Sequence, residues 1–229
     1  MKARKVAGGH QPIRPSAILT AALAAAVIGC GRDQPIDTSA TTDGEQARTS
    51  PNRPAKEFDR AHPVVRVETS QGPITIRLDA VRAPVTVRNF LDCANGGFYD
   101  NTIVHYADPS KIIVAGGYTS ERSLKPPRLA IRNEAHNGRK NVRGTIAMAR
   151  DQSLIDSATS QFFINLADAP QRDYQGDSAD RYGYCVFGQV IEGLDVAERI
   201  AQSPTINLGG DLVQTPDPPV IITSIRIVR

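Results

Sequence analysis

The chain has 229 residues, of which 40% are hydrophobic and 22% charged, and its formal net charge is +3 at pH 7. Four of its basic residues lie within the first 29 positions, which hold no acidic residue, so a chain without that segment would carry a net charge of −1. So small a charge gives no reason to expect nucleic acid or an acidic surface as a partner.

An apolar stretch follows the basic residues at the N-terminus. Residues 17–29 are mostly apolar and small, and the stretch is too short to span a bilayer, which is typical of a secretory signal peptide. Val27-Ile28-Gly29-Cys30 resembles the lipobox of bacterial lipoproteins, in which the cysteine is acylated. The alternative is an ordinary signal peptide followed by a chance cysteine. The lipobox implies that 1–29 is a lipoprotein signal peptide and that Cys30 carries the lipid. The protein would then be extracytoplasmic, anchored on the periplasmic side of a bacterial membrane.

The next segment, residues 30–61, is rich in Asp, Thr, Ser, Gln, Pro and Arg and poor in large apolar side chains. Such a segment cannot bury enough surface to offset its ordering entropy, so we expect a flexible tether. Residues 62–229 suffice for one domain with its own core. Its two cysteines, Cys93 and Cys185, would allow a disulfide in an oxidising compartment, but two half-buried thiols that never meet are the favoured interpretation.

Patterning within the domain predicts strands and two helices. Residues 64–68 and 74–78 alternate apolar and polar side chains around a turn, which predicts a β-hairpin. Pro84 suits the first position of a helix that ends at Gly96-Gly97, and a second short helix is predicted at 194–201. Further strands are predicted at 102–106, 112–115, 129–132, 144–150, 157–165, 184–190 and 220–228. About eight strands, many of them half-buried, together with two helices favour a mainly β fold class: a closed eight-stranded antiparallel barrel capped by two helices.

Two of these strands carry most of the information about function. Gly144-Thr145-Ile146-Ala147-Met148-Ala149-Arg150 and Ser157-Ala158-Thr159-Ser160-Gln161-Phe162-Phe163-Ile164-Asn165 resemble the central signature of the cyclophilin-type peptidyl-prolyl isomerases. The resemblance covers nearly all of 64–229. It implies a cyclophilin-like barrel that isomerises Xaa-Pro bonds without a cofactor. Together with the signal peptide, it implies that the partners are proline-containing segments of exported proteins.

The same resemblance implies a set of site residues. Gln161 and Phe163 would point from one strand into a proline pocket. His105-Tyr106 stands where the family has a His-Arg pair, whose Arg donates to the prolyl nitrogen as the amide twists. A structural role for His105 and a rim position without chemistry for Tyr106 are the alternatives. The remaining substrate-binding positions implied are Ile112, Ile113, Ala115, Ala149 and Tyr184.

The chain departs from the family at three of these positions. Tyr106 replaces the catalytic Arg, Ile112 replaces an aromatic residue, and Ala115 replaces a Gln. Losing a charged donor aimed at the transition state costs about 2–4 kcal/mol, so we expect weakened catalysis. Lys111 or Arg172 could supply a substitute cation. The alternative function is a non-catalytic peptide-binding module or chaperone. Restoring activity would require Arg at 106 together with Phe at 112 and Gln at 115.

No other catalytic class competes. The four histidines are scattered and give no metal-ligand spacing. The sequence also lacks a glycine-rich phosphate loop followed by Lys-Ser/Thr and a nucleophile elbow.

Overall fold

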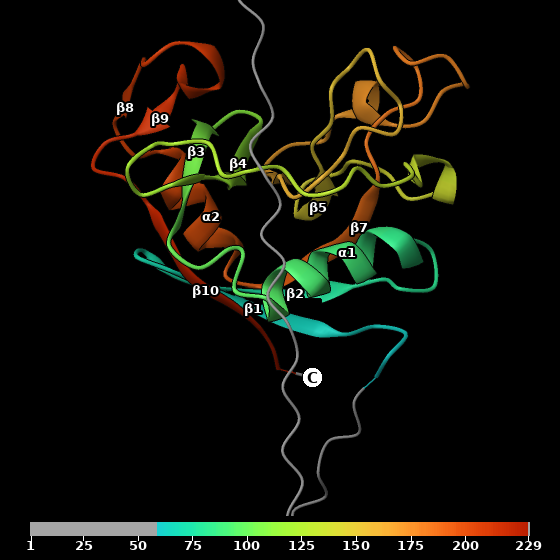
Figure 1. The fold of residues 1–229 in the computed structure, drawn as a ribbon, viewed down its shortest axis with the longest axis horizontal. Coiled ribbons are helices and arrows are strands. Elements are labelled where there is room, and N and C mark those ends of the chain that lie inside the picture. The colour runs from blue at the N-terminus through green and yellow to red at the C-terminus, as the bar shows by residue number, and fades with distance from the viewer. Residues whose placement is uncertain (1–58, 229) are drawn as a thin grey trace, which may run out of the picture. The chain divides into compact units, whose positions relative to one another are not determined.

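The structure, a computed structural model, describes residues 59–228 of the protein (Figure 1). Within these residues eight strands form a closed, antiparallel barrel, which confirms the predicted fold class. The signal peptide, Cys30 and most of the tether lie outside the described residues. In spatial order the strands are β1 (Val64–Thr69), β10 (Ile221–Ile227), β3 (Thr102–Asp108), β4 (Ile112–Thr119), β6 (Phe162–Asn165), β5 (Thr145–Met148), β7 (Val186–Glu192) and β2 (Gly72–Leu78).

Two helices pack against the barrel, as predicted. Helix α1 (Pro84–Asn95) begins at the proline, whose missing N–H costs nothing in the first turn. The free N–H groups of that turn are satisfied from a distant loop, because Glu134 accepts bonds from the backbone N–H groups of Val85 and Thr86 at 3.1 and 2.9 Å. Helix α2 is Leu194–Ala201. No helix among residues 59–228 is long and apolar enough to cross a membrane.

Apolar side chains fill the barrel and also form a small cluster outside it. The main core joins the inward-facing strand residues to the buried faces of α1 and α2. Phe90 of α1 anchors this junction, with its ring centroid 5.2 Å from that of Phe187. The second cluster is separate from the interior and consists of Ala147, Phe163 and Val186. We call it the outer cluster, because it marks the surface on which the candidate site is built.

Some irregular regions differ from the predicted elements. The strand predicted at 129–132 is reduced to a single bridge between Ile131 and Ala158, and the strand predicted at 157–165 begins only at Phe162. An unpredicted two-stranded sheet follows α2 and pairs β8 (Thr205–Ile206) with β9 (Thr215–Pro216). The described residues also contain the short 3₁₀ helices η1 (Ala135–Asn137), η2 (Pro170–Arg172) and η3 (Gly210–Leu212).

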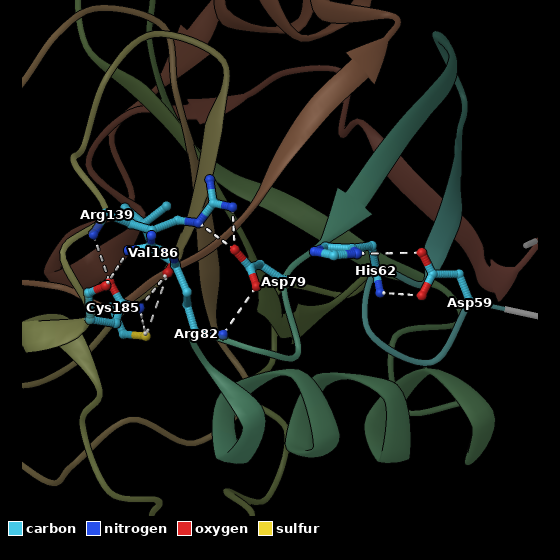
Figure 2. A network of polar contacts seen from close by, with 8 residues as sticks. Asp59, His62, Asp79, Arg82, Arg139, Cys185 and Val186 are labelled. Atoms are coloured by element: carbon cyan, nitrogen blue, oxygen red, sulfur yellow. Dashed lines mark hydrogen bonds and ion pairs between the residues drawn. The ribbon is translucent and has the colours of Figure 1, made fainter.

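The domain holds the chain a few residues before its predicted start. The backbone N–H of Ala80 donates to the carbonyl of Ala61 at 2.9 Å. Figure 2 shows the His62 ring between the carboxylates of Asp59 and Asp79, with His62 Nδ1 3.3 Å from Asp59 Oδ2. Asp79 in turn accepts a bond from Arg139 Nε at 2.8 Å. The tether boundary predicted at residue 61 therefore falls inside a polar network that is part of the domain.

Cys93 and Cys185 are free and buried. Cys93 lies on the buried face of α1, and Cys185 directly precedes β7. Burial raises the pKa of the Cys185 thiol to about 12. This thiol therefore stays protonated and unreactive at neutral pH.

Candidate active site

A cleft of about 590 Å³ opens beside the outer cluster. It brings together five of the predicted site residues, although their roles stay predictions. Val114 and the segment around η3 also contribute to it. The lining residues are His105, Tyr106, Ile112, Val114, Ala149, Arg150, Asp151, Ser157, Thr159, Gln161, Gly210, Asp211 and Val213.

A β-bulge in β3 places both His105 and Tyr106 in this cleft. Val104 pairs with Ala115 across β4, whereas Tyr106 pairs with Val114, so His105 is an extra residue without a partner in the register. Neighbouring residues of a regular strand point to opposite faces, and a bulge is a device that re-aims one of them. Here it allows two consecutive side chains to line the same cleft.

The register of β4 decides which of its residues reach the site. Val114 lies opposite Tyr106 on one side and Phe163 on the other, so Val114 and Ile112 share the cleft face. Ile113 and Ala115 point the other way and are buried in the barrel core at 4% and 3% exposure. The structure therefore does not bring these two predicted pocket residues to the cleft. Val114 occupies the cleft position that was assigned to its neighbours.

Gln161 lies over the glycine pair that follows β4's apolar residues. A Cβ atom at Gly117 would stand 2.7 Å from Gln161 Cδ, closer than real contacts allow, so only glycine leaves room for this amide. Gly116 has φ +86° and lies against the Tyr99 ring, a conformation that L side chains rarely adopt. Gly117 thus leaves room for Gln161, which lies half-buried along the cleft.

Phe163 and Tyr184 lie beside the cleft without lining it. Phe163 is flanked across its neighbouring strands by Val114 and Ala147 and is only 4% exposed. The Tyr184 ring packs edge-on against it at 5.6 Å between centroids. Tyr184 is half-buried, and the Arg150 guanidinium covers its ring at 5.1 Å.

His105 is an uncharged residue at neutral pH. Its side chain is buried against the Tyr118 ring, 4.8 Å between centroids, and Nδ1 has no hydrogen-bond partner among residues 59–228. Burial lowers the pKa of His105 to about 4, and nearby Asp211 and Gln161 only partly oppose this. A neutral imidazole cannot replace the charged donor that the cyclophilin family uses.

The pKa of His105 predicts a pH-dependent stability. The unfolded chain protonates this residue below about pH 6.5, whereas the native protein does so only near pH 4. The unfolded state therefore binds more protons in this window, and the free energy of unfolding should fall by roughly 3 kcal/mol between pH 7 and 4.

Urea unfolding at several pH values measures this effect. The His105→Gln variant should show a much flatter pH dependence between pH 6.5 and 4. His136→Asn, which removes an exposed histidine, should retain the wild-type slope. An unchanged slope in His105→Gln would contradict the assignment.

Among the described residues, the cleft contains no free cation. Arg150 lines it, but its guanidinium donates to several backbone carbonyls, including those of Gly183 at 2.8 Å and Ala179 at 2.7 Å. Lys111 pairs with Asp108 at 3.0 Å and does not line the cleft. Arg172 does not line it either. The Tyr106 hydroxyl lines the cleft and makes no hydrogen bond with any residue from 59 to 228.

Sequence reasoning missed two groups of cleft residues. The first lies in or next to the signature strands, where cross-strand pairing could have indicated it: Val114, Arg150, Asp151, Ser157 and Thr159. The second comes from the segment between β8 and β9, which has no pattern that relates it to the barrel: Gly210, Asp211 and Val213. Residues 59–228 contain no cluster of His, Cys, Asp or Glu suited to a metal ion.

Comparison with known proteins identifies the family. Residues 64–227 match the profile described as cyclophilin type peptidyl-prolyl cis-trans isomerase/CLD. This chain belongs to the cyclophilin-type peptidyl-prolyl cis-trans isomerases. It is 45% identical over 166 residues to peptidyl-prolyl cis-trans isomerase A of Dickeya dadantii, covering 72% of this chain and 84% of that protein.

Further relatives agree in sequence and fold. Peptidyl-prolyl cis-trans isomerase B of Escherichia coli is 42% identical over 164 residues, covering 72% of this chain and 99% of that protein. A cyclophilin-type isomerase of Cryptosporidium parvum, crystallised in the presence of the dipeptide Ala-Pro, superimposes with a TM-score of 0.61 at 25% identity. That match covers 72% of this chain and 99% of the other.

Proposed function

We propose that this isomerase acts, with weakened catalysis, on Xaa-Pro segments of exported proteins and is held at a membrane by a lipid on Cys30. The proposal of weakened catalysis is supported by the position of Tyr106. Tyr106 follows the bulge in β3 and lines the cleft. The family resemblance assigns it the place of the family's Arg. The exported substrates and the anchor rest on the sequence of residues 1–30, which the structure does not describe.

The chemistry requires little from the protein beyond selective binding. Rotation about an Xaa-Pro bond is slow because the amide has partial double-bond character, with a barrier near 20 kcal/mol. An isomerase accelerates it by binding the twisted amide more tightly than the planar one. The Tyr106 hydroxyl can donate to the prolyl nitrogen of the twisted amide, but it is neutral. We therefore assign Tyr106 a weaker version of the Arg's role, with Gln161 orienting the peptide.

A non-catalytic peptide-binding module or chaperone is the second candidate. It is favoured by the lack of a free cation among the described residues that line the cleft, since Arg150 is engaged by backbone carbonyls. Both candidates require a cleft that accepts proline peptides. They differ only in turnover.

A prolyl isomerisation assay separates the two candidates. We expect kcat/KM to lie at least about a hundredfold below that of a relative with the intact His-Arg pair, because the charged donor is missing. A rate near that of the relative would contradict weakened catalysis. Peptide binding without measurable turnover would favour the binding module.

The anchor is tested by fractionating cells that produce Cys30→Ala. The wild-type chain should incorporate labelled fatty acid and sediment with membranes, because each buried methylene contributes about 0.8 kcal/mol. Cys30→Ala should lose the label and be released or retain its signal peptide. Ser50→Ala serves as a control in the same segment. A mature-sized Cys30→Ala protein that stays with the membranes would exclude the lipid anchor.

A further inference from the structure

The side chain of Arg172, the last residue of η2, covers the outward face of Phe163. The Arg172 guanidinium lies over the ring, with its central carbon 5.5 Å from the ring centroid. This distance is within the range of a cation–π contact. Val114, the neighbour of Phe163 on β4, lines the cleft. Phe163 and Arg172 do not line the cleft. The space above the ring is therefore filled by Arg172 itself.

The backbone of Arg172 is firmly held, whereas its side chain is not. Its N–H donates to the carbonyl of Ala169 at 2.9 Å, and its carbonyl accepts from the N–H of Tyr184 at 2.9 Å and from Asn141 Nδ2 at 3.0 Å. The guanidinium makes one long bond, from Nη1 to Asn165 Oδ1 at 3.4 Å. No carboxylate among residues 59–228 forms a salt bridge with it. The rigid backbone of Arg172 thus holds a weakly bonded guanidinium over the Phe163 ring.

We propose that Arg172 is an affinity-determining residue of this isomerase: its guanidinium occupies the face of Phe163 on which the ring of a substrate proline would pack. The proposal rests on the proposed function and on the family resemblance, which implies that Phe163 forms part of the proline pocket. The guanidinium must leave this face before the proline binds. Arg172 therefore lowers the affinity for Xaa-Pro peptides and sets the KM of the reaction.

The surroundings of Arg172 make this displacement feasible. The guanidinium gives up one long hydrogen bond and a ring contact, and it is well hydrated once it reaches water. The bond to Asp108 raises the pKa of Lys111, and the positive charge of Arg172 opposes this rise only slightly, so the two cations repel each other weakly. Lys111 is already paired with Asp108 at 3.0 Å, which leaves Arg172 as the side chain that moves.

Isothermal titration calorimetry, which measures the Kd of a short Ala-Pro peptide for the full-length chain, tests the proposal. Arg172→Leu removes the charge and the planar group but leaves the backbone contacts intact. We expect it to lower the Kd of the peptide about two- to fivefold, the size of one exposed cation–π contact. In the isomerase assay KM should fall by the same factor with kcat unchanged. Arg172→Ala should behave likewise. Arg199→Leu, which removes an arginine paired with Asp195 on α2, should match the wild type.

The outcomes distinguish this inference from the proposed function. An unchanged or raised Kd in both Arg172 variants would overturn the inference, while turnover by the wild type would leave the proposed function standing. A lowered Kd without turnover in any protein would support the inference and favour the binding module over the isomerase. A fall in kcat in Arg172→Leu would show that the guanidinium acts as a substitute donor, which would also overturn it.

Discussion

Replacing Tyr106 with Arg is expected to raise kcat/KM for an Xaa-Pro peptide by less than about tenfold, whereas Tyr106→Arg combined with Ile112→Phe should raise it about a hundredfold or more. An Arg donor acts only when the proline is held within hydrogen-bond reach, and a misplacement of about 1 Å can cost a hundredfold. Ile112 lines the cleft beside Val114. An aromatic side chain at position 112 would enlarge the apolar surface of the cleft there. Residues that act as one unit give non-additive effects, so the two changes should reinforce each other.

Single-turnover and steady-state assays of the two single variants and the double variant measure this coupling. Tyr106→Phe is the matched control, because it removes only the hydroxyl. If the hydroxyl is the residual donor, Tyr106→Phe should lower kcat by up to about tenfold without changing KM. Full recovery from Tyr106→Arg alone would show that Ile112 already supports productive binding and would contradict the prediction.

Local patterning was sufficient to predict the barrel and both helices. The alternating residues of 64–68 and 74–78 form the paired strands β1 and β2, and Pro84 begins α1. These signals are reliable because one face of each element is buried, and a shift of register would expose its apolar side chains. Strand predictions were less accurate for segments that form only one or two backbone hydrogen bonds with a neighbouring segment. Residues 129–132 lack the alternation and the partners of a full strand and form a single bridge.

The site was harder to predict because it depends on register. The sequence shows nothing at His105 that marks a bulge, yet that bulge puts Tyr106 opposite Val114. Since side chains alternate along a strand, an error of one residue exchanges the cleft face for the core face. Ile113 and Ala115 lie on the core face in this way, whereas Ile112 lies on the cleft face. Asp211 was missed for another reason: it belongs to a segment between β8 and β9 whose packing is long-range.

Replacing Ala115 with Gln is expected to destabilise the protein rather than help restore activity. Ala115 is 3% exposed and lies opposite Val104 inside the barrel. A Gln here would place an amide without hydrogen-bond partners in an apolar core and would add Cγ, Cδ, Oε1 and Nε2 beyond the buried β-carbon. Unpaired burial and overpacking together should lower the free energy of unfolding by about 2–4 kcal/mol. The repair that the family resemblance suggested at this position would therefore fail.

Val114→Gln is the matched control, because it lies next to Ala115 on the same strand but on the cleft face, where it is half-buried. Its amide can reach water, so we expect a loss of no more than about 1 kcal/mol. Urea unfolding of both variants measures the difference. Equal losses would show that the two positions share one environment and that the register of β4 differs from the one described here. A larger loss in Ala115→Gln follows directly from the pairing of Val114, rather than Ala115, with Phe163.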